Sequence, residues 1–468
     1  MPHFTTAAFS AGPLIDIAAA LHSQRSDPWL FERTAAASLL IERPALTIRT
    51  VEGSVCLEAH TPAGAALTRG LADRFLAQAG CIAFERPTGH DLEARLHAPG
   101  PFDVLRAAVG SRGAPLVLGI LAFDHAELFE DLPPPPPDRT GFPQAHFIVP
   151  DRWLTRDPDG TTCAHALGSE ADAADLAARA AAAPSLAPPP PAPAAHASVD
   201  LDDTAYARLV SICQAHVAAG DVFQIVPSRT FSARCTDPFD AYRRLSAADP
   251  APYRFYAPGP GWTLFGASPE SAVKVSADGE VEVRPIAGTR PRGRNAAEDA
   301  AFEAELRADE KELAEHRMLV DLARNDVARV SIPGTRRVTD KLHVQRAARV
   351  MHLVSTVTGQ LRPDLDALHA LQACLNAGTL SGAPKLRATE LLRKLEASRR
   401  GPYGGAIGVF AADGSLDTAI VIRSALVVDG VAQVRAGAGV VFDSVPQAEA
   451  DETRRKAAAV LDALGVAA

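Results

Sequence analysis

One proline-dense stretch constrains the architecture of this chain more than any other feature. The sequence APSLAPPPPAPAAHA, residues 183–197, has prolines at positions 184, 188 to 191 and 193. Proline lacks a backbone N–H and its ring clashes with the preceding helical turn, so neither a helix nor a central strand continues through such a stretch. Proline-rich segments act as semi-rigid spacers. The sequence therefore predicts an N-terminal domain over residues 1–183, a linker over 184–199 and a second domain over 200–468.

The length and charge of the chain agree with this division and exclude several classes of protein. A chain of 468 residues is long enough for roughly two to three domains. Its 47% hydrophobic and 22% charged residues are typical of a soluble globular protein. The net charge of −9 excludes a general nucleic-acid or membrane-surface binder. Any site for an anion must therefore be a local cluster of cations.

Two observations bear on cellular location. The uncharged stretch from Ala180 to Val199 is broken by its prolines and cannot form a membrane helix, and the opening MPHFTTAAFSAG lacks the regions of a secretory signal. The cysteines show neither a CxxC pair nor zinc-site spacing, and they lie at positions 56, 81, 163, 213, 235 and 374. We therefore expect a cytoplasmic protein with reduced, buried thiols.

The order of predicted elements indicates the fold class. An amphipathic helix is predicted over 202–221 from the apolar spacing of Tyr206, Leu209, Val210, Cys213 and Val217. Strands are predicted in VFQIVPSRTF, WTLFGASPESAVKVS and EVEVRPIAGT. Further helices are expected over 300–330 and 365–375, from 384 to a stop at Gly401, and from about 448 to the end. Strands and helices alternate in blocks instead of strict βαβ order. This favours an α+β fold with large antiparallel sheets.

Two pairs of acidic residues have helical spacing. Glu312 and Glu315 are three residues apart, and Glu449 and Glu452 repeat that spacing near the C-terminus. Residues at i and i+3 share a helix face. Carboxylates from two facing helices are able to hold a hard cation such as Mg²⁺. Surface ion pairing is the alternative, since Glu452 and Lys456 are an i, i+4 pair.

Glycine-rich turns follow several predicted strands. They are RPIAGTRPRG, NAGTLSGAPK, GPYGGAIG and RAGAGVVFDS. Glycine allows close approach of a ligand to backbone N–H groups, so such turns bind carboxylates or phosphates. None has the GxGxxG or GK[ST] pattern of a nucleotide-binding loop. Each taken singly also fits a plain turn, but four in one region favour a small acidic ligand.

Three polar residues in apolar surroundings are candidates for catalysis. His352 in VMHLVS is either a hydrogen-bonded core residue or a general acid or base. Glu270 in FGASPES is either a capping group or a proton donor. Gln224 in VFQIV donates and accepts hydrogen bonds but is no base.

Taken together, these segments resemble the chorismate-utilising enzyme family, and within it the large, chorismate-binding subunits of anthranilate synthases (component I). The resemblance is dense from about Gly220 to the C-terminus and thin before residue 200. It is carried by the motifs GDVFQIVPSRTF, LFGASPES, RPIAGTRPRG, KELAEHRMLVDLARNDVAR, VMHLVS, LNAGTLSGAPKLRA, RRGPYGGAIG, LDTAIVIRSAL and AGAGVVFDSVPQAEADET. It implies an αββα sandwich, in which antiparallel sheets pack together between helices, and an interlocked N-terminal domain of regulatory type.

The resemblance also implies roles for individual residues. Glu315 and Glu452 match principal Mg²⁺ ligands, with Glu312 and Glu449 in support. Glu270 matches a general acid for the C4 hydroxyl, and His352 a histidine linked to pyruvate elimination. Residues expected to contact chorismate are Gly288, Thr289, Thr379, Tyr403, Arg423, Gly437, Ala438, Gly439 and Lys456.

The implied reaction converts chorismate and ammonia to anthranilate and pyruvate, the first step of tryptophan biosynthesis. Relatives that use water carry a lysine where this chain has Gln224, and relatives that form 4-amino-4-deoxychorismate commonly have a lysine in place of Ala287. Both positions favour amination at C2. A synthase of the same fold that makes 4-amino-4-deoxychorismate or stops at 2-amino-2-deoxyisochorismate is an alternative. A non-catalytic, ligand-binding regulatory subunit is another, which the intact candidate residues oppose.

The resemblance implies a partner and an altered regulatory site. The sequence has no GxCxG nucleophile motif, so a separate glutamine amidotransferase subunit is expected to supply ammonia, giving a hetero-oligomer. In feedback-inhibited relatives, segments like LLES and PSPYMF form the tryptophan site. The corresponding residues here are Glu42, Arg43, Pro252, Tyr253 and Arg254, in LLIER and PAPYRFY. The two arginines change the shape and charge of that pocket, so we expect weakened or lost inhibition by tryptophan.

Overall fold

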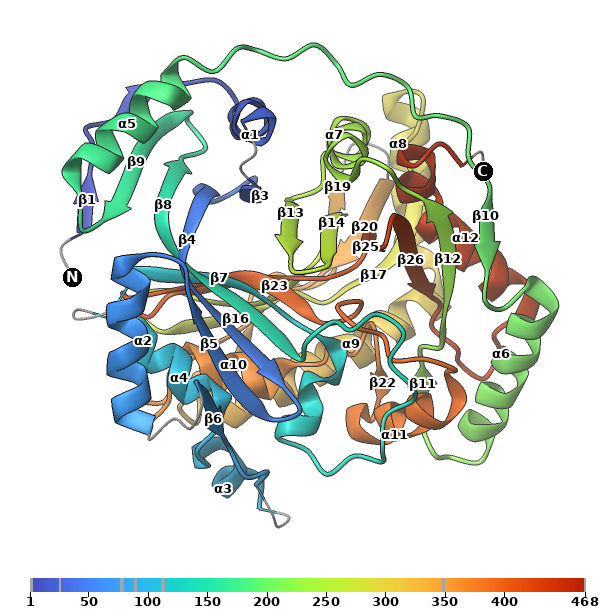
Figure 1. Ribbon diagram of the computed structural model, residues 1–468. Helices are drawn as coiled ribbons and strands as arrows, with labels where there is room; N and C mark the ends of the chain where they lie inside the picture. Colours follow the sequence, from blue (N-terminus) through green and yellow to red (C-terminus); the bar gives the residue numbers. More distant parts are fainter. Residues whose placement is uncertain are drawn as a thin grey trace.

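A large antiparallel sheet dominates the protein. The computed structural model describes residues 3–24, 27–75, 80–87, 91–110, 114–346 and 350–466. In this part of the chain, 21 strands form one hydrogen-bonded sheet that closes on itself, and two small sheets of two and three strands accompany it. Every ladder between described strands is antiparallel, and helices flank the sheet (Figure 1). The predicted α+β class with large antiparallel sheets is confirmed.

Strands from the first part of the chain make up one half of this sheet. Alternation of apolar and polar residues is weak in the longest of them, β4 and β8, because both of their faces are largely buried. The strands are β1 (His3–Thr5), β2 (Phe9–Ser10), β3 (Trp29–Arg33), β4 (Ser38–Val51), β5 (Ser54–Ala59), β6 (Cys81–Ala83), β7 (Leu116–Leu121), β8 (Ala145–Arg156) and β9 (Thr161–Leu167).

Strands after the proline-rich segment make up the rest. In the large sheet these are β10 (Ala197–Val199), β12 (Ser228–Arg234), β13 (Tyr253–Gly259), β14 (Trp262–Ser268), β15 (Ser271–Val275), β16 (Glu280–Val283), β18 (Arg337–Val338), β21 (Val357–Gln360), β23 (Ala406–Ala411), β24 (Leu416–Ile420), β25 (Ser424–Val428) and β26 (Val431–Gly437). The small sheets contain β11 (Gln224–Ile225) with β22 (Gly382–Ala383), and β17 (Ile286–Pro291), β20 (Val350–Val354) and β19 (His343–Arg346).

Several helices begin at capping side chains that the sequence supplies, as at Ser169, Asp202 and Asp366. The helix predicted over 300–330 is interrupted, because Asp309 accepts hydrogen bonds from the N–H groups of Lys311 and Glu312 and starts a new helix. The helices are α1 (Leu14–Ser23), α2 (Pro62–Phe75), α3 (Leu92–His97), α4 (Pro101–Ala108), the 3₁₀ helix η1 (Phe123–Leu128), α5 (Glu170–Ala181), α6 (Asp203–Ala218), α7 (Pro238–Ala248), α8 (Ala296–Ala308), α9 (Glu310–Val330), α10 (Ala367–Cys374), α11 (Lys385–Leu395) and α12 (Pro446–Ala463).

The proline-rich segment runs along the outside of the molecule between α5 and β10 (Figure 1). The two parts of the chain that it joins share one sheet, because β3 pairs with β13 and β7 pairs with β23. A core cluster contains residues of both parts, among them Phe31, Trp153 and Phe255. The predicted domain boundaries stay a prediction, but the two parts are interlocked.

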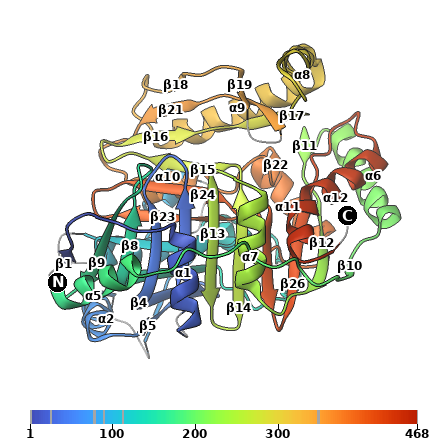
Figure 2. The same cartoon turned by 90° about the horizontal axis from the view of Figure 1, so that it is seen from above.

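Two groups of helices border the region in which the candidate residues lie. Figure 2 shows α8 and α9 beside β17 and β19 on one side of the molecule, and α6, α11 and α12 close to β11 and β22 on another. Helices α6 and α12 contact each other, as do α9 and β17. This arrangement places the N-terminal turns of α9 and α12, which carry the acidic pairs, near the ends of β17 and β26.

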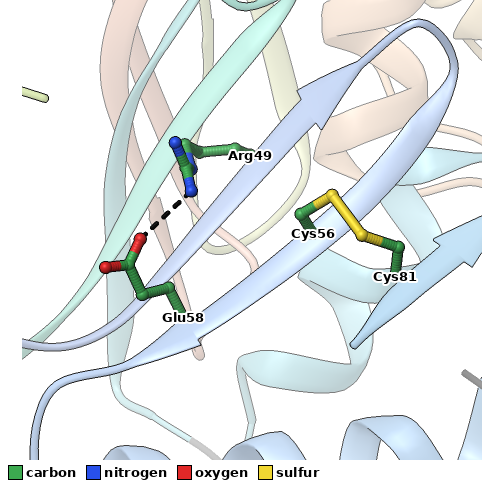
Figure 3. Close-up of a disulfide and its surroundings, with 4 residues drawn as sticks. All are labelled: Arg49, Cys56, Glu58 and Cys81. Carbon is green, nitrogen blue, oxygen red and sulfur yellow. Dashed lines mark hydrogen bonds and ion pairs between the residues drawn. A yellow bond between two sulfur atoms is a disulfide. The ribbon is translucent and has the colours of Figure 1, made fainter. Parts of the chain in front are cut away.

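The cysteines differ in part from expectation. Cys56 and Cys81 lie directly opposite each other on the adjacent strands β5 and β6, and a disulfide joins them (Figure 3). The prediction of reduced thiols is therefore wrong for these two, because the sequence did not reveal that the strands pair. Cys163, Cys213, Cys235 and Cys374 are free. No helix in the described part of the chain is both long and apolar enough to cross a membrane.

Candidate active site

The segment RPIAGTRPRG forms strand β17 with an irregularity at its centre. Gly288 has a φ of 67°, and the register of β17 against β20 shifts between Ala287 and Thr289. A Cβ on Gly288 would lie 2.9 Å from a methyl carbon of Leu306 and 3.2 Å from a carboxylate oxygen of Glu312. Glycine is therefore required both by the left-handed backbone and by the space available. The bulge brings Thr289 opposite His352 on β20.

Two of the three arginines of this segment take part in ion pairs with carboxylates of the protein. Arg290 pairs with Glu305, Asp309 and Glu312, and Arg292 pairs with Asp299. These ion pairs join the strand to α8 and α9, so they support the segment rather than leave cations available for a ligand.

His352 is held by hydrogen bonds at one ring nitrogen. Its Nδ1 lies 3.2 Å from the carbonyl oxygen of Gly288 and 3.0 Å from the hydroxyl oxygen of Thr289. Burial lowers the pKa of His352, and the charge of Arg423 acts in the same direction. A neutral ring that donates from Nδ1 to the Gly288 carbonyl has Nε2 as a hydrogen-bond acceptor. The side chain is thus able to accept a proton from a ligand.

Glu270 follows β14 and is aligned by a threonine from another segment. The hydroxyl of Thr379 donates to Oε1 of Glu270 over 3.0 Å. Burial raises the pKa of Glu270 to about 7, although the hydrogen bond from Thr379 and the charges of Lys456 and Arg423 oppose this rise. A carboxyl group with a pKa near neutrality is able to donate a proton under physiological conditions. This is the property that a general acid requires.

Lys456 of α12 connects several candidate residues. Its Nζ donates to the carbonyl oxygen of Gly437 over 3.0 Å and lies 2.6 Å from a carboxylate oxygen of Glu452. Its own carbonyl accepts a hydrogen bond of 2.6 Å from Arg423, a residue with a φ of 51°. Burial lowers the pKa of Arg423. Two cations therefore lie near the end of β26, where an anionic ligand would offset the cost of burying the guanidinium of Arg423.

The four predicted metal ligands lie in the first turns of two helices whose charges interact. Burial raises the pKa of Glu315, and the charges of Glu312 and Glu452 raise it further. Burial likewise raises the pKa of Glu312 and of Glu449. Burial also works against the ionisation of Glu452, but Lys456 holds its pKa below the ordinary value. The negative charges of three of the four carboxyl groups are thus poorly compensated by nearby cations.

These residues fit a divalent cation in their chemistry. Oxygen ligands from carboxylates suit Mg²⁺, and a cation would relieve the mutual repulsion that raises the pKa of Glu315. Their oxygens do not already surround one point. Within the described residues, one group of three side chains has its acidic and imidazole ligand atoms within 4.8 Å of one another. It consists of Glu93, His97 and Asp364, which are exposed. Direct binding of one ion by three or more of these carboxylates would therefore require some of the side chains to move.

Gln224 and the glycine segment 437–439 border the same region. Nε2 of Gln224 donates to Glu315 over 3.1 Å, and Oε1 of Gln224 is buried without a partner among the described atoms. A Cβ on Gly439 would lie 2.4 Å from Nε2 of Gln224 and 3.7 Å from an oxygen of Glu315. Glycine at 439 is therefore needed for the close approach of the chain to this amide.

Sequence reasoning missed a supporting residue of this segment. The hydroxyl of Tyr206, on α6, accepts a hydrogen bond from the N–H of Ala438 and donates to the carbonyl of Pro227. The side chain is fully buried. Its apolar i, i+3, i+4 spacing indicated only a core position, and no sequence signal pointed to the role of its hydroxyl. Tyr403 lies nearby, since a Cβ on Gly437 would lie 3.1 Å from its hydroxyl oxygen.

The residues predicted to border a regulatory pocket lie on β4 and on or directly before β13, and they take part in ion pairs or hydrogen bonds. Arg43 pairs with Asp151 and Asp172, and Arg254 pairs with Glu32. Glu42 pairs with two arginines, Arg152 at 2.8 Å and Arg179 at 2.6 Å. Pro252 accepts a hydrogen bond from Thr34, and the hydroxyl of Tyr253 donates to Asp417 over 2.9 Å. Protein side chains thus satisfy the charges of this region.

Comparison with known proteins identifies the family. The family model described as chorismate binding enzyme matches residues 55–462. The chain belongs to the chorismate-binding enzymes. It is 48% identical to the pyocyanine-specific anthranilate synthase component 1 of Pseudomonas aeruginosa, over 93% of this chain and 88% of that protein. It is 47% identical to anthranilate synthase component 1 of Vibrio cholerae, over 80% and 76% of the two chains.

Solved structures of chorismate-binding enzymes share the fold. The crystal structure of anthranilate synthase component I from Streptococcus pneumoniae superposes with a TM-score of 0.72 at 31% identity, over 91% of this chain and 92% of that one. The menaquinone-specific isochorismate synthase of Escherichia coli gives a TM-score of 0.70 at 19% identity, over 99% and 94% of the chains, which shows the fold alone.

Proposed function

We propose that this chain is the chorismate-aminating subunit of an anthranilate synthase, converting chorismate and ammonia to anthranilate and pyruvate. The relatives named anthranilate synthase component 1, which align over most of the chain, support this function. The observation that carries the mechanism is the pairing of Glu270 with Thr379, because it combines an aligned carboxyl group with a pKa of about 7.

The protein's own side chains supply proton transfer and positioning. Glu270, protonated near neutral pH, donates a proton to the C4 hydroxyl of chorismate as that group leaves and ammonia attacks C2. Arg423 and Lys456 attract the carboxylates of the substrate. His352 is neutral and accepts the proton lost as pyruvate is eliminated, while Thr289 holds the orientation of its ring. Aromatisation of the ring drives the second stage, so the site mainly has to position groups.

We propose Mg²⁺ as the cofactor, held by Glu315 and Glu452 with Glu312 and Glu449 in support. When bound, such an ion would neutralise and polarise the ring carboxylate of chorismate. The raised pKa values of Glu312, Glu315 and Glu449 support this assignment, because each of these carboxyl groups gains from a nearby cation.

Two positions favour ammonia attack at C2 over the other reactions of the family. Ala287 is buried and has no amine that could attack the ring, which disfavours the 4-amino product. Gln224 cannot deprotonate water, but its unpartnered Oε1 accepts a hydrogen bond from ammonia. Substitution of Ala287 and Gln224 therefore tests the choice of product and of nucleophile separately.

The proposal includes a partner and a location. A glutamine amidotransferase subunit would supply ammonia and form a hetero-oligomer with this chain. The names of the relatives support this, because they designate one component of a synthase. We also propose a cytoplasmic location, which the four free cysteines support and the Cys56–Cys81 disulfide does not. A pathway to a specialised product, instead of tryptophan, is compatible with the name of the Pseudomonas aeruginosa relative.

Analysis of the reaction products tests the proposed function. The purified chain is incubated with chorismate, magnesium and ammonium at a pH high enough to provide free ammonia, and products are separated by chromatography with mass detection. We expect anthranilate and pyruvate in equal amounts, and their loss with EDTA. Accumulation of 4-amino-4-deoxychorismate or 2-amino-2-deoxyisochorismate would replace the proposal with a sister activity. Absence of chorismate turnover would indicate a non-catalytic subunit.

A further inference from the structure

A buried arginine lies behind the candidate active site and is not among its predicted residues. Arg400 comes between α11 and Tyr403 in the sequence and is only 5% exposed. Its guanidinium carbon lies 4.4 Å from the ring centroid of Phe123 and 5.7 Å from that of Tyr403. A desolvated guanidinium is attracted to aromatic faces by the charge distribution of the rings. The position of Arg400 is thus coupled directly to that of Tyr403.

Two backbone hydrogen bonds couple Arg400 to further candidate residues. Nη1 donates over 2.6 Å to the carbonyl of Leu380, which directly follows Thr379. Nη2 donates over 2.7 Å to the carbonyl of Val226, two residues after Gln224. The same planar group therefore connects the segment that aligns Glu270 with the strand that carries Gln224. A planar guanidinium with several fixed donors is suited to hold separate chain segments in one geometry.

Glu396 extends this connection to the glycine segment at the end of β26. Its carboxylate accepts hydrogen bonds from Nε and Nη2 of Arg400, at 2.8 and 2.7 Å, and from Arg435 at 3.0 Å. It also accepts from the N–H and hydroxyl of Ser228, at 2.9 and 2.7 Å. Ser228 is the ladder partner of Gly437, whose carbonyl accepts the hydrogen bond from Lys456.

Burial makes this network rigid. Glu396 and Arg400 are both more than nine-tenths buried, and burial opposes the ionisation of Glu396. The two arginines overcome this and hold the pKa of Glu396 below its ordinary value. Low local dielectric strengthens a network in which each member is paired, and makes loss of one partner costly. The segments that meet at Arg400 are therefore held in one arrangement.

We propose that Arg400 is a positioning residue, whose single guanidinium sets the relative placement of Tyr403, Thr379, Gln224 and Gly437. This inference rests on the proposed function, because it assigns those four residues to one substrate site. Arg400 touches no substrate in this role and acts through the residues it holds. A displacement of about 1 Å at reacting groups is enough to lower the rate of an enzyme about 10²-fold.

Arg400→Lys tests the proposal, because lysine keeps the charge but cannot reach Glu396, Leu380 and Val226 together. We expect the KM for chorismate to rise about tenfold and kcat to fall about 10- to 100-fold. In Arg400→Ala, added guanidinium at concentrations far below those that unfold the protein should restore part of kcat, because Glu396 and the two carbonyls remain in place to bind it.

Arg393→Ala is the matched control. Arg393 is similarly buried, pairs with Asp124 and Glu127 and donates to the carbonyl of Pro133, and none of these partners is a candidate site residue. Its loss should lower the melting temperature about as much as Arg400→Ala, with kcat and KM within about twofold of the wild type. Guanidinium should not raise its activity.

The outcomes separate this inference from the proposed function. Any of three results would overturn the positioning role. They are wild-type kcat and KM in Arg400→Lys, impairment of Arg393→Ala to the same degree as Arg400→Ala, and absence of guanidinium rescue in folded Arg400→Ala. Should Arg400→Ala not fold, the constants of Arg400→Lys decide. If the wild type forms no anthranilate, the proposed function fails. The increase in melting temperature on adding chorismate then decides the inference, which requires a smaller increase in Arg400→Lys than in the wild type.

Discussion

Two charged regions of this molecule differ in how completely their charges are paired. In the predicted regulatory region, on β4 and β13, Arg43, Glu42 and Arg254 each have an oppositely charged protein partner. In the candidate active site, Glu270 and Glu315 take part in no ion pair within 4.0 Å as far as the chain is described, and burial raises the pKa of both. The first region is complete as it stands, whereas the second would be stabilised by a bound ligand.

The difference indicates where this protein gives up folding stability for the sake of function. Burying an ionisable group without a partner costs stability, so such groups persist where a ligand, a metal ion or a proton transfer requires them. Charged groups that are fully paired within the protein need no ligand or metal ion to offset their burial. We therefore expect substitutions to lower activity strongly in the second region and to leave the catalytic rate nearly unchanged in the first.

The largest effect is expected from the acidic pair of α9. Glu315→Gln removes a charge that would hold Mg²⁺, and metal ions contribute several kcal/mol to the stabilisation of developing charge. We expect kcat/KM for chorismate to fall about 10³-fold or more. Magnesium binding, measured by calorimetry in the absence of substrate, should weaken in parallel. Glu310→Gln, at an exposed position on the same helix, should leave both quantities unchanged, and retention of full affinity by Glu315→Gln would refute the metal assignment.

A smaller but still large effect is expected at the general acid. Glu270→Gln should lower kcat about 10²-fold or more, because it can no longer donate a proton. In the wild type, kcat/KM measured at constant free ammonia should fall tenfold per pH unit above about 7, since ionisation of Glu270 removes the acid. Thr379→Val deletes a hydrogen bond that lowers this pKa, so the decline should begin at a higher pH. A profile that is flat from pH 6 to 9 would contradict the assignment.

Product choice is expected to depend on one small side chain. Ala287 is 8% exposed, so Ala287→Lys places an amine in the site beside the bulge of β17. We expect anthranilate formation to fall about 10²-fold, with some 4-amino product, because the amine competes with ammonia for C2. Chromatography of the products measures the ratio. Ala287→Ser controls for the change in polarity and should keep anthranilate as the product; an unchanged ratio in Ala287→Lys would mean that position 287 does not face C2.

The smallest effect is expected in the paired region. Tryptophan at micromolar concentration should leave the wild-type rate within about twofold of its uninhibited value, because ion pairs satisfy Arg43 and Arg254 and a ligand would have to break them. Calorimetry with tryptophan gives an independent measurement of binding. The double variant Arg43→Ser, Arg254→Met should bind tryptophan more tightly than the wild type. Strong inhibition of the wild type would remove the contrast between the two regions.

Local sequence patterns predicted much of the fold. The spacing of Tyr206, Leu209, Val210 and Cys213 identified the buried face of α6, because helical periodicity depends only on the local chain. The spacing of Glu312 and Glu315 likewise placed both residues on one helix. The break between α8 and α9 was missed, since the capping geometry of Asp309 depends on how the chain turns there.

Local sequence patterns could not predict which residues pair when they are distant in the sequence. The disulfide forms because β5 and β6 pair in a register that brings Cys56 opposite Cys81, and no spacing rule revealed that register. The same holds for the contact of Glu270 with Thr379, 109 residues apart. Resemblance to a family placed both residues in one site, but the direction and length of their hydrogen bond required the folded chain.

The sequence by itself determined the fold class, the proline-rich connection, the helix faces and the identity of the reactive groups, because these depend on residue type and on neighbours within a few positions. Only the tertiary structure decided which charges are compensated and which are not. Arg290 lies in a glycine-rich segment, and only the folded chain revealed its carboxylate partners in and beside α8 and α9. Arg400 looked ordinary until burial placed it at the meeting point of four segments. Compensation and burial depend on groups distant in sequence, and folding alone brings those groups together.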